Sequence, residues 1–243
     1  MNNNPTNAAE QCELGKKYWN GDGVPQDLAK AMYWFTQAAG QGNADAQAIL
    51  GFKYTDGKSV PKDLEKAHYW LTKAAEQGNE NAQAMLGVNY SDGNGVPKDM
   101  EKSIYWLTKA AEQGNTIAQM KLGSHYSNED GVKEDWEKAN YWYAKAAEQG
   151  NTDAQAVLGF NYAGGNGVPQ DMEKAVYWLT KAAEQGVELA QTVLVSIYAN
   201  GDGVPKNLEK VRYWLVKLAE QGNENAQEAL SEFDNEQRSI KKS

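Results

Sequence analysis

The sequence contains very few of the residues that most often carry out chemistry. Among 243 residues there are one cysteine, Cys12, and two histidines, His68 and His125. A single cysteine cannot form an intramolecular disulfide, and two histidines at unrelated positions of the repeat described below do not form a set of converging metal ligands. We therefore expect no catalytic, cofactor-binding or metal-binding residue. Cys12 is interpreted as a small packing residue, and each histidine as a surface or boundary residue.

Positive charge is also scarce. The chain has 24 Lys and Arg residues against 33 Asp and Glu residues, which gives a formal net charge of -9. The one local excess of positive charge is Arg238, Lys241 and Lys242 near the end. Such a balance repels phosphate backbones, so a nucleic-acid partner is not expected.

Long apolar runs are missing as well. No stretch of 18 consecutive apolar residues occurs, so insertion into a membrane is not expected. The first ten residues, MNNNPTNAAE, do not have the basic and apolar regions of an export signal. A cytoplasmic location is the default expectation, although the mature form of a secreted or periplasmic protein would have the same features.

Aromatic residues and glycines recur with a period of 36 residues. Three residue types that share one period over six copies predict a stacked array of repeats. The series are Trp34, Trp70, Trp106, Trp142, Trp178 and Trp214; Tyr18, Tyr54, Tyr90, Tyr126, Tyr162 and Tyr198; and Gly42, Gly78, Gly114, Gly150, Gly186 and Gly222.

Each repeat has the pattern of two helices. In residues 43–78, Ala46, Leu50 and Tyr54 are four residues apart, which places them on one face of a first helix. Gly51 lies beside this face, and its lack of a side chain allows a second helix to approach closely. Turn-forming residues follow, and Asp63 is placed to cap the second helix. The apolar face of that helix includes Trp70, and neither helix can bury its apolar face without neighbouring repeats.

The repeated string AQ..LG..Y..G.GVP.D.EKA.YWL.KAAEQG, as in residues 82–90 and 93–114, resembles the Sel-one-like repeat, a relative of the tetratricopeptide repeat. This resemblance implies a right-handed superhelix of antiparallel helix pairs that acts as a protein-interaction scaffold, mostly in bacteria, without an active site. One cysteine-rich branch of that family binds penicillin-like compounds and closes each repeat with a disulfide. Its cysteine pairs are absent here, so that activity is not carried over.

The predicted fold is therefore an all-α solenoid. Its expected parts are a disordered or extended N-terminus at 1–6, six repeats at 7–42, 43–78, 79–114, 115–150, 151–186 and 187–222, a capping helix at 223–236 and a flexible tail at 237–243.

Two repeats depart from the pattern. In the fourth repeat, acidic residues gather in the turn between the helices; the alternatives are a solvated surface turn and an acidic contact site for a basic partner or a cation. These residues are Glu129, Asp130, Glu134, Asp135 and Glu137. In the sixth repeat, Val195 replaces the close-packing glycine and Leu218 replaces an alanine, which predicts altered helix packing.

Partner contacts are predicted on the first helices. In solenoids of helix pairs these helices line the concave wall, and the resemblance to tetratricopeptide repeats points to their variable positions. Apolar residues at these positions suggest two patches on either side of a polar fourth repeat; the alternative is that they complete the packing between first helices. The candidate residues are Ile49, Phe52, Met85, Val88, Lys121, Ser124, Val157, Phe160, Val193 and Ser196.

Two further series are constant in the repeats. The glutamines are interpreted as structural, each bonded to a neighbouring backbone group. The tyrosines that precede each tryptophan either form an aromatic ladder for ligands or, as favoured here, pack between adjacent second helices. The glutamines are Gln11, Gln47, Gln83, Gln119, Gln155, Gln191 and Gln227, and the tyrosines are Tyr33, Tyr69, Tyr105, Tyr141, Tyr177 and Tyr213.

Taken together, these patterns favour a scaffold or adaptor that binds a partner protein or peptide on the concave surface. A second hypothesis is an inhibitor or immunity-type protein that neutralises a toxic effector or a host factor. A third, of another class, is a small-molecule or cation binder or an enzyme that uses the acidic fourth repeat. The identity of the partner and the oligomeric state are left open by the sequence.

Overall fold

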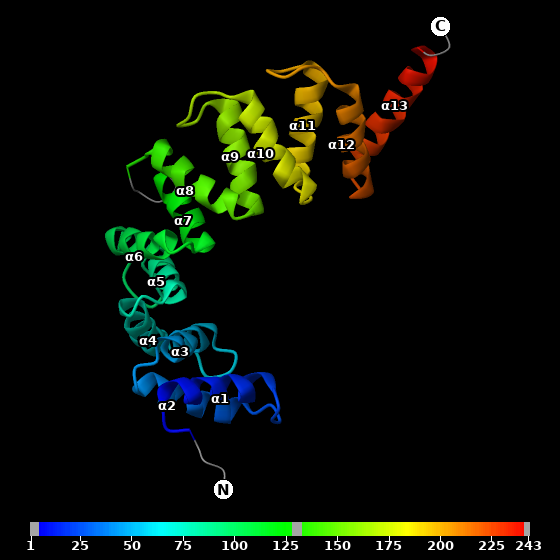
Figure 1. Cartoon of the computed structure of the whole chain (residues 1–243). Coiled ribbons are helices and arrows are strands. Elements are labelled where there is room, and N and C mark those ends of the chain that lie inside the picture. Colours follow the sequence, from blue (N-terminus) through cyan, green and yellow to red (C-terminus); the bar gives the residue numbers. More distant parts are fainter. Residues whose placement is uncertain (1–4, 128–132, 241–243) are drawn as a thin grey trace. The chain divides into compact units, whose positions relative to one another are not determined.

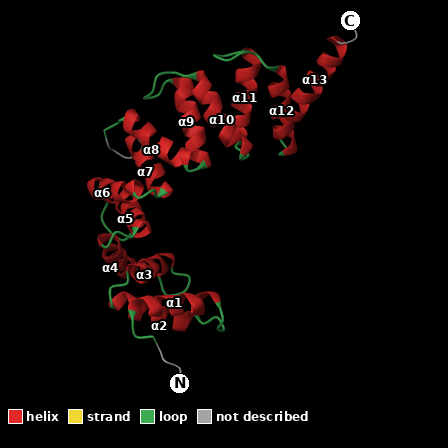
Figure 2. Ribbon diagram, viewed as in Figure 1, coloured by secondary structure: helices red, strands yellow, loops and turns green. Residues whose placement is uncertain are grey.

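The computed structural model describes residues 5–127 and 133–240, and every regular element in this part of the chain is an α-helix (Figures 1 and 2). The structure is therefore an all-α solenoid of consecutive helix pairs, as the sequence predicts. The helices are α1 (Ala8–Asn20), α2 (Leu28–Gly40), α3 (Ala44–Asp56), α4 (Leu64–Glu76), α5 (Glu80–Asp92), α6 (Met100–Glu112), α7 (Thr116–Tyr126), α8 (Trp136–Glu148), α9 (Thr152–Gly164), α10 (Met172–Glu184), α11 (Glu188–Asn200), α12 (Leu208–Glu220) and α13 (Glu224–Ile240).

The chain forms two compact units that are described separately. The first contains α1 to α6 and the start of α7 up to Leu122, and the second contains the described residues from Gly123 onward. Within each unit the odd-numbered helix of a repeat packs against the even-numbered helix that follows it. That helix then packs against the first helix of the next repeat.

Polar caps fix where the helices begin. Asn43 accepts a hydrogen bond from the Ala46 amide at 2.9 Å at the start of α3, and Asp63 accepts from the Lys66 amide at 3.0 Å at the start of α4. Each cap satisfies an amide that has no partner within the helix. The Asp63 amide also donates to the Tyr54 carbonyl at 3.0 Å, which ties the start of α4 to the end of α3. The predicted cap at Asp63 is confirmed.

A left-handed glycine ends the first helix of the pair. Gly57 has φ +66°, and its amide donates to the Lys53 carbonyl at 3.2 Å. This conformation is unfavourable for residues with a side chain, so glycine is the suitable residue for stopping α3 and reversing the chain.

The glycine inside the first helix allows the two helices to touch. A Cβ atom on Gly51 would lie 2.5 Å from Leu71 Cγ and 3.2 Å from the Leu71 backbone nitrogen. Neither distance leaves room for a methyl group, so the predicted role of Gly51 is confirmed. Gly87 meets Leu107 in the same way, also at 2.5 Å.

Leucine and alanine, more than tryptophan, form the buried core. Leu50 and Leu71 are completely buried, as are Ala67 and Ala74. Trp70 is only partly buried, and so are the tryptophans of the third, fourth and fifth repeats; Trp34 and Trp214 are buried. The expectation that Trp70 lies in the core between repeats is therefore corrected, because small alanines bring the helices too close together for the whole indole to fit between them.

The constant glutamines join neighbouring repeats. Gln47 Nε2 donates to the Ala39 carbonyl of the preceding repeat at 3.0 Å, and Gln47 Oε1 accepts from Gln77 Nε2 at 2.6 Å. Gln47 is buried, so both polar ends of its side chain require partners. The prediction of a bond to a neighbouring backbone group is confirmed, and the second bond adds a link to the end of α4.

The sixth repeat differs from the others, as its sequence predicts. Val187 provides no side-chain cap for α11. With Val195 in place of glycine, the opposing Leu215 is 7% exposed, whereas Leu71 is completely buried. Helix α13 follows and is held by a two-bond ion pair in which Arg212 donates to Asp234 at 2.8 and 3.0 Å. It ends at Ile240, later than the predicted end at 236, and residues 241–243 lie outside the described part.

The acidic turn of the fourth repeat is described only in part, because Glu129 and Asp130 lie outside the described residues. Asp135 caps α8 by accepting from the Lys138 amide at 3.0 Å, as Asp63 caps α4. Glu134 accepts a hydrogen bond from the Trp136 indole. Asp135 therefore has the same structural role as its counterparts, and this favours the solvated turn.

Acid is expected to destabilise the fold through the aspartate caps. Hydrogen bonds from Lys66, chiefly from its backbone amide, lower the pKa of Asp63 below its usual value. The stabilisation by the ionised cap is therefore complete above the unfolded pKa of about 3.9, and it is lost as the pH falls through the lower folded value. Asp63→Asn should keep the cap, as Asn207 does in the sixth repeat, but lose this dependence. Thermal unfolding between pH 7 and 2 should show a smaller decrease in Tm for the variant; an equal decrease would contradict the cap's contribution.

Candidate partner-binding surface

The structure places the predicted contact residues on the first helices of five repeats. Ile49 and Phe52 lie on α3, Met85 and Val88 on α5, Lys121 and Ser124 on α7, Val157 and Phe160 on α9, and Val193 and Ser196 on α11. Ser196 is exposed and the other nine are partly buried. Partial burial fits both the contact surface and the packing alternative, so the surroundings of each residue decide between them.

Four of these residues are brought together in the first unit. Phe52, Met85, Val88 and Lys121 line one open cavity of about 430 Å³ across α3, α5 and α7. The remaining lining residues are Asn81, Ala84, Asn115 and Ile117. We call these eight residues the first-helix groove.

The first-helix groove is apolar at its base and polar at its edge. Phe52 and Met85 pack against the buried cluster that contains Leu71 and Leu86, so the base is rigidly supported. At the edge, Asn115 Nδ2 donates to Asn81 Oδ1 at 3.2 Å. Among the described residues that line it, Lys121 is the one that carries a charge. The groove can therefore accept apolar side chains and attract a single negative charge.

Ile117 is the residue that the sequence prediction missed. Its side chain is 64% exposed, although isoleucine is usually buried, and it stands at the edge of the groove. Its signal was present in the sequence: it occupies the third position of the repeat, where Asp45, Asn81 and Asp153 are polar. Because Ile117 belongs to the fourth repeat, the expectation that this repeat is a polar divider is corrected.

In the second unit two of the predicted residues also contact the buried core. Phe160 and Val193 pack against the buried cluster that contains Leu194 and Ile197. Leu189, at the same repeat position as Ile117, is 60% exposed. Phe52 and Met85 make the same kind of contact with the core, so this contact fits both the contact surface and the packing alternative.

The tyrosine series lies on the surface. Its members are 49 to 56% exposed, and each ring meets its neighbouring tryptophan edge-on, as Tyr69 meets Trp70 at 4.9 Å between centroids. About half of each ring is therefore exposed, and packing of the other half between adjacent second helices stays a prediction. The edge-on contact with the adjacent tryptophan is a favourable arrangement for two aromatic rings.

Cys12, His68 and His125 are the residues that could most readily take part in chemistry. Burial raises the pKa of the Cys12 thiol and lowers that of His68, which favours the neutral form of both. His125 is completely buried, so its interpretation as a surface or boundary residue is wrong; its repeat position faces inward, as buried Asn89 and Asn161 show. Across residues 5–127 and 133–235, no group of three or more His, Cys, Asp or Glu side chains is arranged to hold a metal.

None of the described helices combines sufficient length with sufficient apolar character to cross a membrane.

Comparison with known proteins identifies the repeat. The family model described as "Sel1 repeat" matches residues 11–43, 44–79, 81–115, 116–151, 152–187 and 188–223. The chain therefore belongs to the Sel1 repeat family, whose members generally mediate protein–protein interactions and are typically not enzymes. No curated protein matches the chain.

Two solved structures are similar over most of the chain. One is a protective antigen of uropathogenic Escherichia coli strains with an SLR fold, at 42% identity and a TM-score of 0.85 over 92% of this chain. The other is a Sel1 repeat protein from Oxalobacter formigenes, at 37% identity and a TM-score of 0.73, also over 92%. The alignment covers 48% of the Escherichia coli protein and 88% of the Oxalobacter protein.

Proposed function

We propose that this protein is an interaction scaffold that binds a partner protein through the first-helix groove. The observation that carries this proposal is the exposed Ile117 beside an open apolar cavity of about 430 Å³. Exposed apolar surface that adjoins a concave site is typical of interaction sites. The family to which the chain belongs supports the same class of function.

The lining suggests the chemistry of the partner segment. Phe52, Met85 and Val88 offer apolar contacts, and methionine adapts its shape to different side chains. Lys121 favours an acidic group next to the apolar anchor. The proposed ligand is therefore a segment with one or two large apolar side chains and a neighbouring carboxylate.

Substitution of Ile117 tests this proposal. Ile117→Asp places a charge at an exposed position, so we expect the fold to be retained and the affinity for the partner to fall at least tenfold, which corresponds to about 1.4 kcal/mol. The partner is first captured from an extract of the source cells, and its affinity for each variant is then measured by calorimetry. Leu189→Asp is the matched control, because Leu189 is 60% exposed at the same repeat position of α11.

The outcomes separate the hypotheses. Equal affinity of wild type and Ile117→Asp would exclude the first-helix groove as the binding site. A toxic effector or host factor as the captured protein would make the chain an inhibitor or immunity-type protein, which is a special case of the same binding. A small-molecule or cation site in the acidic fourth repeat predicts instead a thermal shift with that ligand, unaffected by Ile117→Asp.

A further inference from the structure

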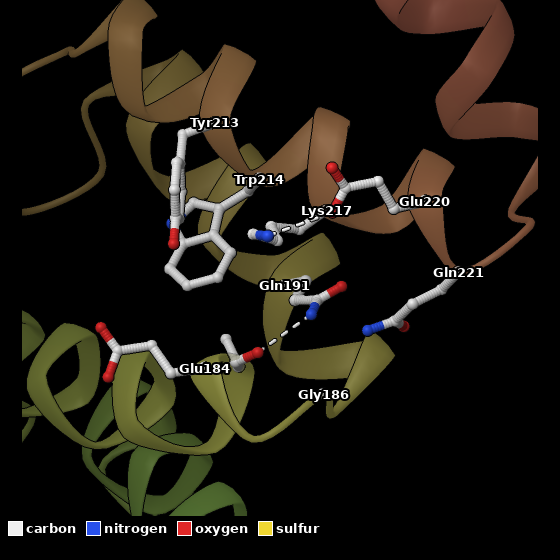
Figure 3. Close-up of a pocket in the computed structure, with 9 residues that line it drawn as sticks. Glu184, Gly186, Gln191, Tyr213, Trp214, Lys217, Glu220 and Gln221 are labelled. Atoms are coloured by element: carbon white, nitrogen blue, oxygen red, sulfur yellow. Dashed lines mark hydrogen bonds and ion pairs between the residues drawn. The ribbon is translucent and has the colours of Figure 1, made fainter.

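A second cavity lies among α10, α11 and α12, in the second unit (Figure 3). Its volume is about 500 Å³, and it shares no residue with the first-helix groove. Tyr213, Trp214 and Lys217 of α12 line one side, and Glu184 and Gln191 line the other. One feature, an unpaired buried oxygen, distinguishes it from the corresponding places in the other described repeats, and two further features indicate which ligand it could bind.

The first feature is a buried acceptor without a donor. Gln191 is 1% exposed, and its Nε2 donates to the Ala183 carbonyl at 2.9 Å, but its Oε1 has no hydrogen-bond partner. In the first, second, third and fifth repeats this oxygen accepts from the glutamine 30 residues later, as Gln155 Oε1 does from Gln185 Nε2 at 2.7 Å. Gln221 is the corresponding donor, but it forms no such bond. A buried acceptor left unpaired is costly, so this oxygen is suited to receive a donor from a ligand.

The second feature is a tyrosine face without its cation. In the second to fifth repeats a lysine ammonium lies over the ring of the exposed tyrosine, 5.1 to 5.8 Å from the centroid. In the sixth repeat, Lys217 instead pairs with Glu220 at 3.0 Å. Tyr213 is therefore left without the cation that Tyr69, Tyr105, Tyr141 and Tyr177 have.

The third feature is the charge of the lining. Glu184 and Glu220 carry negative charge and Lys217 carries positive charge, which leaves one uncompensated carboxylate. The missing groups are therefore a hydrogen-bond donor for Gln191 Oε1, a cation for the Tyr213 ring and a positive charge for Glu184.

We propose that this cavity binds the guanidinium group of an arginine in a partner protein. A guanidinium is planar, is always charged and has five N–H donors, so it offers a face for the Tyr213 ring, a donor for Gln191 Oε1 and a positive charge for Glu184. A lysine ammonium matches the charge but lacks the flat face. The protein source of the arginine rests on the proposed function, whereas recognition of the guanidinium does not.

The test uses N-acetyl-arginine amide, which carries a single charge on its side chain, as the probe. Binding is followed by NMR shifts of the Gln191 side-chain amide and the Trp214 indole in the full chain. We expect Tyr213→Ala and Glu184→Gln each to weaken binding about tenfold or more, because each removes one of the proposed contacts. Both side chains are exposed, so the fold should be retained. Tyr177→Ala is the matched control, because the Tyr177 ring already has Lys181 over it, and it should leave the affinity unchanged.

Two further probes give a clear decision. N-acetyl-citrulline amide has nearly the same shape without the charge; equal binding of this probe, or no binding of the arginine probe, would overturn the proposal. An affinity for free arginine tenfold higher than for N-acetyl-arginine amide would contradict the proposal that the arginine belongs to a partner protein. Ile117→Asp should not affect the arginine probe, so loss of the partner through the first-helix groove and failure of this cavity are distinguishable results.

Discussion

Leu107→Ala is expected to lower the free energy of unfolding by about 3 to 5 kcal/mol. Leu107 is completely buried on α6, where it lies directly against Gly87 of α5. Removing its branched end leaves a cavity that two helices already in close contact cannot fill by moving closer together. Urea unfolding followed by circular dichroism measures the change as a lower midpoint.

Leu208→Ala is the matched control for this prediction. Like Leu107, Leu208 belongs to the second helix of a repeat. It lies at the start of α12, however, and is 51% exposed. Its truncation should change stability by about 0.5 kcal/mol or less, as for most surface substitutions. Similar losses for Leu107→Ala and Leu208→Ala would mean that the leucines do not form the core between the helices.

Gly87→Ala is expected to destabilise the protein by about 2 kcal/mol, against the usual preference for alanine in helices. Helix propensity alone favours alanine over glycine by about 1 kcal/mol. The new methyl group, however, would lie 2.5 Å from Leu107 Cγ and 3.1 Å from the Leu107 backbone nitrogen. Because the backbone cannot yield as a flexible side chain can, the overlap should outweigh the gain in propensity. Thermal and urea unfolding measure the net effect.

Gly40→Ala is expected to change the stability in the opposite direction in the same experiment. Gly40 is helical, and nothing lies within 4 Å of a Cβ atom built on it. This substitution should therefore stabilise the protein by about 0.5 to 1 kcal/mol. Adding Leu107→Ala to Gly87→Ala should make the glycine substitution less costly, because the two side chains compete for one space. Stabilisation by Gly87→Ala would show that α5 and α6 are not in the close contact described.

Much of the fold could be predicted because each structural device is repeated in the sequence. The caps, the left-handed turn glycine and the glycine opposite leucine depend on backbone requirements that few residue types satisfy. The partial exposure of Trp70 could not be predicted from the spacing of residues, because it depends on the width of the gap between helices. The same holds for Tyr69, whose exposure depends on how its ring leans against Trp70.

The candidate sites were predictable only in part. Phe52, Met85 and Val88 were found by their variable repeat positions, while Ile117 was missed because the third position was not compared between repeats. The unpaired Gln191 Oε1 has no signal in the sequence, since both Gln191 and Gln221 match the constant pattern. Whether two constant residues meet depends on small differences in helix placement, which the residue types alone do not specify.

Site-specific photo-crosslinking tests the central claim most directly. A photoreactive phenylalanine analogue at position 85 or 117 places the crosslinker in the first-helix groove, and one at position 105 places it on the exposed face of α6, where Tyr105 is 53% exposed. We predict that the same partner protein is captured from positions 85 and 117 and not from position 105. Capture from position 105 alone would contradict a scaffold that binds its partner through the first helices.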